Sequence, residues 1–311
     1  MTIHPCFIGC DIAKAHLDLF EETSGQSLRI ANTPEAIAAW LSSLDLGTAF
    51  VAFEATGPYD MALLRALEQA GCRFVRVNPA RARDFARATG RLAKTDAIDA
   101  RMLAAMARVL ALAPDPSADP ARQGLARLHK RRDQLVEMRA CERVRAGEAG
   151  DHTGSLARHL AWLDGEIAIL ERLIDEALRA DEALADMQAL LRSAPGVGPV
   201  TATTLVALMP ELGRCSAKAI AALAGLAPFN NDSGSLRGRR SLKGGRRRVR
   251  RALYMAALAA IRTSPRFKAF YDTIKARRAA PKIAIVAVAR KLLTTLNAMA
   301  KTKTAFHTAH T

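Results

Sequence analysis

Short apolar runs alternate with helix-like stretches through the first hundred residues of the chain. Apolar runs of strand length predict five strands, at 6–10, 17–20, 28–30, 48–53 and 74–77. Apolar residues at helical spacing predict helices at 34–44, at 58–70 and from 79 onward. Thr33 should cap the first helix, with Pro34 in the first helical position, and Gly71 should end the second.

These elements follow the order strand, strand, strand, helix, strand, helix, strand and further helices, which matches the ribonuclease H-like plan. In that plan the first and fourth strands lie side by side. Asp11 and Glu54 each stand at the end of one of these strands, so we expect them to face each other across a short gap. Asp96 and Asp99 lie three residues apart where another helix should begin, and they should point to one side over the same edge.

Four carboxylates gathered in this way predict a site for divalent metal ions. Mg²⁺ takes oxygen ligands, and it usually combines one or two carboxylates with waters and substrate phosphates. Two such ions, about 3.5–4 Å apart, act on the oxygens of a phosphodiester. An acidic residue after an apolar strand is also ordinary loop chemistry, so the prediction depends on all four together. An actin-like ATPase also begins with an Asp after its first strand, but a second Gly-rich phosphate loop is missing from this sequence.

A helical region should follow from 114 to 190. Three prolines separate it from the first domain, Pro114, Pro116 and Pro120. Its second helix carries apolar residues at heptad spacing, at Leu156, Leu160, Leu163, Ile167, Leu170, Ile174, Ala177 and Leu184. Asp181 is the one interruption of that pattern. Three glycines, Gly147, Gly150 and Gly154, can supply the bend between the two helices. The spacing favours either an antiparallel hairpin or an intermolecular coiled coil.

The remaining residues, 191–311, combine a glycine turn with a strongly basic stretch. The segment 194–201 has the Gly-hydrophobic-Gly turn of a helix-hairpin-helix at Gly196 and Gly198, whose following helix start can hold a phosphate. Small residues and arginines then dominate 232–251, which predicts phosphate binding through Arg237, Arg239, Arg240, Lys243, Arg246, Arg247, Arg248, Arg250 and Arg251. Helices at 252–262, 266–278 and 283–300 should close the chain.

The composition supports a polyanionic partner. Half of the 311 residues are hydrophobic, which allows a sizeable core, and the formal net charge of +16 favours nucleic acid over an anionic membrane surface. The five cysteines form no CxxC pair, a pattern that suits buried thiols in a reducing compartment. The apolar run at 283–289 is too short to span a bilayer. We expect a soluble, cytoplasmic protein without membrane association.

Eight segments give the sequence a family resemblance that runs nearly end to end. They are GCDIAK at 9–14, FEATGPY at 53–59, NPARARDFA at 78–86, KTDAIDARMLA at 94–104, SAPGVGPVTA at 193–202, LAGLAP at 223–228, DSGSLRG at 232–238 and RRALYM at 250–255. In their order and spacing the sequence resembles the insertion-sequence transposases of the one-ten family, which are related to the Piv-type DNA invertases.

The resemblance implies an α/β plus all-α architecture with three domains. These are a RuvC-like catalytic domain at 1–113, a helical coiled-coil region at 114–190 and a C-terminal transposase domain at 191–311. It implies that Asp11, Glu54, Asp96 and Asp99 bind Mg²⁺ or Mn²⁺ and that Ser233 is a nucleophile, with Ser235 and Ser241 as alternatives. It also implies donor and target DNA, a structured bridge RNA, and assembly into dimers and tetramers. Because the serine and the carboxylates lie in different domains, the active site should be composite.

Two other classes remain open from the sequence. A metal-dependent nuclease resembling a Holliday-junction resolvase would use the carboxylates to activate water, but it gives the region after residue 193 no catalytic role. A non-catalytic RNA-binding protein would use only the basic stretch, and it leaves the four carboxylates unexplained.

Overall fold

The computed structural model describes residues 6–90, 96–115, 119–149, 151, 153–229, 241–242, 244–277 and 280–307, with the backbone alone at 96–98, 149, 229 and 241. The chain divides into two compact units, Met1–Ala118 and Asp119–Thr311. The predicted regions 114–190 and 191–311 therefore fall almost entirely within one unit.

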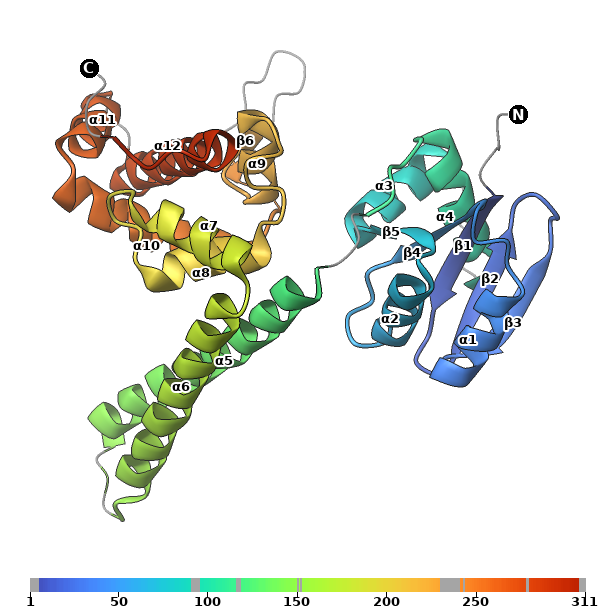
Figure 1. The fold of residues 1–311 in the computed structure, drawn as a ribbon, viewed down its shortest axis with the longest axis horizontal. Helices are drawn as coiled ribbons and strands as arrows, with labels where there is room; N and C mark the ends of the chain where they lie inside the picture. Colours follow the sequence, from blue (N-terminus) through green and yellow to red (C-terminus); the bar gives the residue numbers. More distant parts are fainter. Residues whose placement is uncertain are drawn as a thin grey trace. The chain divides into compact units, whose positions relative to one another are not determined.

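The first unit is built on a mixed five-stranded sheet (Figure 1). Its strands are β1 (Cys6–Ile12), β2 (His16–Glu21), β3 (Ser27–Ala31), β4 (Ala49–Glu54) and β5 (Arg73–Val77). They lie in the order β3-β2-β1-β4-β5, with β1–β2 and β2–β3 antiparallel and β1–β4 and β4–β5 parallel. All five predicted strands are confirmed, as is the contact between the first and the fourth.

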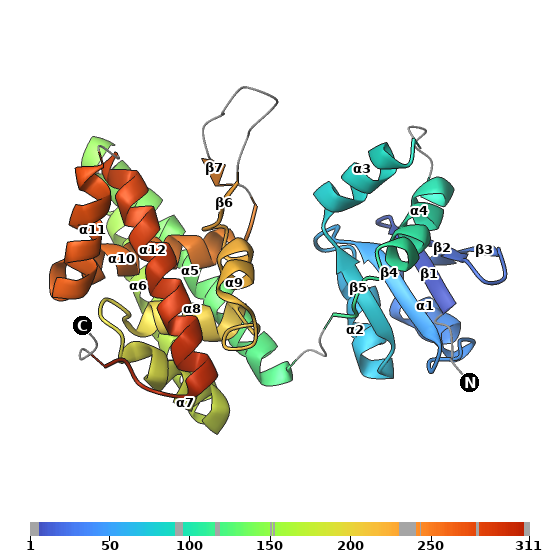
Figure 2. The same ribbon diagram turned by 90° about the horizontal axis from the view of Figure 1, so that it is seen from above.

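Helices cover both faces of this sheet (Figure 2). They are α1 (Pro34–Ser42), α2 (Met61–Ala70), α3 (Pro79–Ala88) and α4 (Asp96–Val109). Helices α1 and α2 pack on the face that carries Ile8 and Cys10, whereas α3 and α4 pack on the face that carries Phe7 and Ala52. Each strand therefore presents alternate residues to two separate cores.

Local capping explains where the helices begin and end. The Thr33 hydroxyl accepts a hydrogen bond from the backbone N–H of Ala36, and Gly71 ends α2 at a φ of 67°, as predicted. The predicted start of α2 at residue 58 is wrong, because the helix begins at Met61. The preceding residues form a loop in which the Thr56 N–H donates to the Asp60 carboxylate.

The second unit begins with an antiparallel hairpin of α5 (Pro120–Ala149) and α6 (Ser155–Arg179) (Figure 1). Leu125 near the start of α5 shares a core with Ile174 near the end of α6, whereas Leu135 packs with Leu163. The structure thus favours the hairpin, one of the two predicted arrangements. The predicted continuous heptad is wrong at its end, since Asp181 caps the separate helix α7 (Glu182–Arg192) and accepts from the Leu184 N–H.

Six further elements follow, namely α8 (Pro199–Leu208), α9 (Ala217–Leu223), the two-stranded pair β6 (Pro228–Phe229) and β7 (Ser241–Leu242), α10 (Arg247–Thr263) and α11 (Pro265–Ala276). The chain then enters α12 (Pro281–Thr302), which is the one described helix that is long and apolar enough to cross a membrane. Its apolar residues, including Val288, Leu292 and Leu296, are buried in the core of the second unit. This burial is typical of the central helix of a helical domain.

Candidate functional site

The carboxyl ends of β1 and β4 bring two of the predicted acidic residues onto neighbouring strands. Cys10 pairs with Phe53 in the parallel ladder, and the next residue on each strand is Asp11 and Glu54 respectively. Both residues are half-buried. The expected meeting of the first and fourth strands therefore places these two carboxylates at the same level of the sheet.

Both carboxylates belong to the face that α4 covers. Side chains alternate along a strand, so Asp11 shares its face with Phe7 and Gly9. A Cβ on Gly9 would lie 1.8 Å from the Ala100 carbonyl oxygen, so α4 is in direct backbone contact with this strand. Glu54 follows Ala52 by two residues, and Ala52 belongs to the same core as α4.

The direction of α4 brings its first turn toward Asp11. Near the helix end, Arg108 donates a 2.8 Å hydrogen bond to Glu22, whose backbone N–H donates to the Phe7 carbonyl. Gly9, two residues after Phe7, contacts Ala100, which lies eight residues before Arg108. Along β1 toward Asp11, the contacting residues of α4 therefore lie closer and closer to the start of the helix. Asp99, one residue before Ala100, is half-buried. The side chain of Asp96 lies outside the described residues.

A fifth carboxylate, Asp18, lies beside Asp11. The two residues pair directly across β1 and β2, so they share a face. Asp18 is only 8% exposed and accepts hydrogen bonds from the Arg29 guanidinium at 2.8 and 2.9 Å, while His16 Nε2 lies 3.4 Å from it. Our sequence analysis missed Asp18, although an aspartate inside the apolar run 17–20 is the signal that marks it.

Acidic surroundings also affect the neighbouring thiol. Cys10 is fully buried, and burial raises its pKa well above the usual value, with the charges of Asp11 and Asp18 adding to the effect. A thiol held in its protonated form is a poor nucleophile and a poor metal ligand. Cys10 is therefore a packing residue.

The donor chemistry at this edge suits a hard divalent cation. Asp11 and Glu54 offer carboxylate oxygens on one face, and Mg²⁺ typically uses one or two protein carboxylates together with substrate phosphates. Among the side chains that the structure describes, no group of three or more His, Cys, Asp or Glu residues is close enough to hold a metal ion. The predicted set includes Asp96, which is not among those side chains.

In the second unit, the predicted glycine turn lies between α7 and α8. Gly196 has a φ of 78°, and a Cβ there would lie 2.3 Å from the Ala256 carbonyl oxygen in α10, so this glycine is required for helix packing. Gly198 precedes α8 as its N-cap and is exposed. Of the two predicted phosphate-binding glycines, only Gly198 is thus exposed at a helix start.

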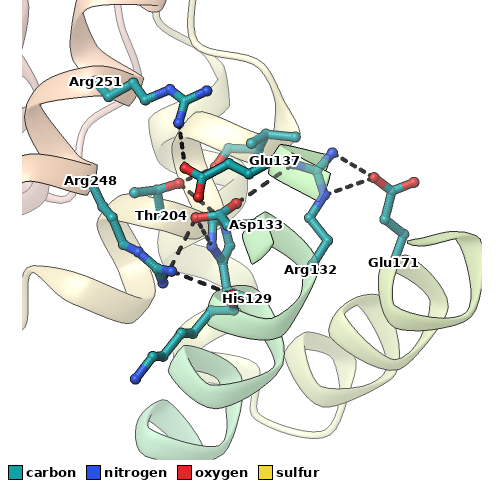
Figure 3. A network of polar contacts seen from close by, with 10 residues as sticks. His129, Arg132, Asp133, Glu137, Glu171, Thr204, Arg248 and Arg251 are labelled. Atoms are coloured by element: carbon teal, nitrogen blue, oxygen red, sulfur yellow. Dashed lines mark hydrogen bonds and ion pairs between the residues drawn. The ribbon is translucent and has the colours of Figure 1, made fainter. Parts of the chain in front are cut away.

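Most of the described arginines of the basic stretch contact other parts of the second unit. The expectation of a helix starting only at residue 252 is wrong, because 247–251 form the first turns of α10. Arg248 lies 3.8 Å from Asp133 of α5, and Arg251 donates a 2.8 Å hydrogen bond to Glu137 one turn further along α5 (Figure 3). These arginines thus join α10 to the hairpin. Arg247 is exposed.

Two further arginines of the basic stretch bind groups within the second unit. Arg246 donates to both carboxylate oxygens of Glu211 at 2.6 Å, and Arg250 donates to the Gly244 carbonyl at 2.7 Å. A Cβ on Gly245 would lie 2.1 Å from the Gly225 nitrogen, so the two backbones cross in contact. Several predicted residues lie outside the described ones, namely Ser233, Ser235, Arg237, Arg239, Arg240 and Lys243, together with the side chain of Ser241.

Comparison with protein families assigns both units. The family model of the DEDD transposases of IS110 type matches residues 8–147, and that of the transposase IS116/IS110/IS902 family matches residues 188–272. The chain belongs to the IS110 family of transposases. This is a family of DNA-recombining enzymes, and the DEDD model agrees with the ribonuclease H-like order of the first unit and suggests dependence on a divalent metal.

Individual relatives support the same assignment. The IS110-family chain is 29% identical to the pilin gene-inverting protein of Moraxella bovis over 308 residues, which is 93% of each protein. It is 34% identical to the insertion element IS900 uncharacterized 42 kDa protein of Mycobacterium paratuberculosis over 50% of this chain and 39% of the relative. It is 32% identical to the insertion element IS110 uncharacterized 43.6 kDa protein of Streptomyces coelicolor over 47% of this chain. The chain matches only 35% of that relative's length.

Proposed function

We propose that this IS110-family protein cuts and exchanges DNA strands as the transposase of an insertion sequence. The observation that carries the proposal is the pairing of β1 with β4, because Asp11 and Glu54 follow paired residues on the sheet face that α4 covers. Ribonuclease H-like enzymes use such an edge for phosphodiester chemistry. The pilin gene-inverting relative, by its name, inverts a pilin gene, which supports a recombinase.

Asp11, Glu54, Asp96 and Asp99 would hold Mg²⁺ or Mn²⁺. When bound, such an ion supplies Lewis-acid stabilisation at the phosphate oxygens. The protein's own contribution is to hold like-charged carboxylates close together, where their repulsion favours a cation. The contact of α4 with β1 and the half-buried positions of Asp11, Glu54 and Asp99 support this assignment.

Ser233 would be the nucleophile. Its hydroxyl loses its proton as Oγ bonds to the DNA phosphorus, the phosphorus–oxygen bond to the leaving strand breaks, and that strand's hydroxyl takes up a proton. The phosphoserine conserves the energy of the broken bond, so a hydroxyl of another strand can displace the serine without ATP. In the sequence Ser233 is followed by Gly234, a residue type that permits many backbone conformations, and by arginines that can stabilise the charge on the phosphate.

Nucleic acids would be both substrate and guide. The net charge of +16 suits donor DNA, target DNA and a structured bridge RNA encoded by the same element. Gly198 at the start of α8 and exposed Arg247 are the described candidates for phosphate contacts. Dimers, tetramers on DNA and a cytoplasmic location belong to the same proposal.

Strand cleavage and recombination test the proposal together. Alanine in place of Asp11, Glu54, Asp96 or Asp99 should abolish cleavage of element-end DNA, while DNA binding and the unfolding temperature stay close to those of the unmodified protein. Chelation of divalent metal should have the same effect. Recombination by an Asp96→Ala, Asp99→Ala double variant in the presence of chelator would refute the metal site.

A metal-dependent nuclease of the resolvase type is the competing function. It would use the same carboxylates with water as the nucleophile, so it would release free cleaved ends and would be indifferent to Ser233. The match of the C-terminal family model at residues 188–272 favours the transposase, because that region includes the serine.

A further inference from the structure

One asparagine side chain ties together the two loops that follow the carboxylate-bearing strands. Asn32, directly after β3, donates from Nδ2 to the Ala13 carbonyl and to the Tyr59 carbonyl, at 2.9 Å each. Ala13 lies two residues beyond Asp11, and Tyr59 lies in the loop that begins after Glu54. A single amide group thus links the chain beyond β1 to the chain beyond β4.

A buried aspartate next to Tyr59 fixes the same loop to the sheet. Asp60 is fully buried, and its Oδ2 accepts hydrogen bonds from the Thr56 N–H at 3.1 Å and from Arg76 Nε at 2.8 Å. Arg76 belongs to β5, where it pairs with the residue before Glu54. The neighbouring residues Tyr59 and Asp60 therefore hold the end of this loop, the first to Asn32 and the second to the sheet.

These buried polar groups lose solvation energy, which suggests that their role is to hold the loop backbone in position. Among the described residues, none supplies a hydrogen-bond partner to three buried oxygens, Asn32 Oδ1, Thr56 Oγ1 and Asp60 Oδ1. Apolar side chains would avoid the loss of solvation that such atoms suffer. A buried ion pair is also often no more stable than well-packed apolar residues. An apolar arrangement of this loop could be as stable, so the polar groups are better explained by the backbone geometry that they impose.

We propose that Asn32 and Asp60 are positioning residues that set the separation of the Asp11 and Glu54 carboxylates. This inference rests on the proposed function. Glu54 is the last residue of β4, and the Ala55 N–H still donates to the Val77 carbonyl, so the loop held by Asn32 and Asp60 begins directly after this last ladder bond. Groups that orient metal ligands change metal affinity or activity by about 10- to 100-fold when they are removed.

Direct measurement of Mn²⁺ binding tests the proposal. The full-length protein with element-end DNA is titrated with Mn²⁺, and the free ion is followed by electron paramagnetic resonance. Asn32→Ala should weaken Mn²⁺ binding about 10- to 100-fold. Asp60→Asn should shift it in the same direction but less, because the amide oxygen can still accept from Thr56 and Arg76.

Asn297 provides a matched control in the second unit. Its side chain also bridges two backbone groups, since Oδ1 accepts from the Gly213 N–H at 2.9 Å and Nδ2 donates to the Cys215 carbonyl at 3.0 Å. Both Asn297→Ala and Asn32→Ala remove two hydrogen bonds and should lower the unfolding temperature, but Asn297→Ala should leave Mn²⁺ affinity unchanged.

The outcomes separate this inference from the proposed function. Unchanged Mn²⁺ affinity in folded Asn32→Ala would overturn it, and if that variant does not fold, unchanged affinity in Asp60→Asn would do so. If Asp11→Ala and Glu54→Ala bind Mn²⁺ as tightly as the unmodified protein does, the proposed metal site is wrong, and the positioning role with it.

Discussion

Replacing Gly9 by alanine should displace α4 from the sheet and disable the carboxylate edge. The added Cβ would lie 1.8 Å from the Ala100 carbonyl oxygen and 2.7 Å from the Ala104 nitrogen. Ordinary contacts begin at 3.4 Å, so the helix must retreat by about 1.6 Å. Both obstructing atoms belong to the backbone, and no change of side-chain rotamer can relieve the contact.

Two magnitudes follow from that displacement. Overpacking of a close-packed interior costs about 1–3 kcal/mol, and a backbone obstruction belongs at the upper end of that range. The helix start carries Asp99, and a misplacement of about 1 Å at reacting groups costs about 100-fold in rate. Gly9→Ala should therefore lose about 3 kcal/mol in the free energy of unfolding and about 100-fold in the rate of strand cleavage.

Denaturant unfolding and single-turnover cleavage of element-end DNA measure the two effects separately. Gly165→Ala is the matched control, because Gly165 lies in α6 and a Cβ there meets nothing within 4 Å. That variant should gain about 1 kcal/mol from helix propensity and cleave normally. Adding Ala104→Gly to Gly9→Ala should not restore activity, since the contact is with backbone atoms.

Stability within about 0.5 kcal/mol of the unmodified protein, together with normal cleavage by Gly9→Ala, would refute the assigned packing of α4 on β1. Loss of stability with normal cleavage per folded molecule would refute the link between α4 and the reacting groups.

Three further outcomes are expected. Burial alone would raise the pKa of the Glu211 carboxyl, but the hydrogen bonds from Arg246 outweigh it and hold the pKa below its usual value. Glu211→Gln should therefore be less stable than the unmodified protein at neutral pH, by about 1 kcal/mol in the free energy of unfolding. This difference should vanish in unfolding curves as the pH falls through the acidic range, where the carboxylate becomes protonated. Arg247→Ala should reduce the salt dependence of nucleic-acid binding without lowering the unfolding temperature, whereas Arg246→Ala should lower that temperature by leaving Glu211 unpaired. Protein purified from cells that carry the whole element should contain one discrete RNA, which sequencing would identify, and random cellular RNA would count against guidance.

Local signals in the sequence predicted the architecture of the first unit. Alternating apolar runs gave the five strands, and the Thr33 and Gly71 caps were predicted correctly because capping depends on a few neighbouring residues. The same plan led to the adjacency of Asp11 and Glu54, since parallel neighbouring strands end at one edge.

Contacts between distant residues could not be predicted in this way. The heptad spacing of apolar residues continues past Asp181, but in the structure this side chain caps a new helix. A helix can end and a new one begin at a cap while the spacing of apolar residues stays the same. The basic stretch suggested a row of phosphate-binding arginines, but Arg246 and Arg251 have carboxylate partners on elements far away in the sequence. Asp18 was missed because its position beside Asp11 depends on strand register.

Trapping of a covalent protein–DNA adduct tests the central claim most directly. Labelled element-end DNA is incubated with the protein and Mg²⁺, the reaction is stopped with denaturant, and the adduct is separated by gel electrophoresis. The proposed mechanism predicts an adduct with the unmodified protein, with Ser235→Ala and with Ser241→Ala, and none with Ser233→Ala or Glu54→Ala. An adduct that persists in Ser233→Ala would assign the nucleophile elsewhere, and free cleaved ends without any adduct would contradict the transposase mechanism in favour of the metal-dependent nuclease.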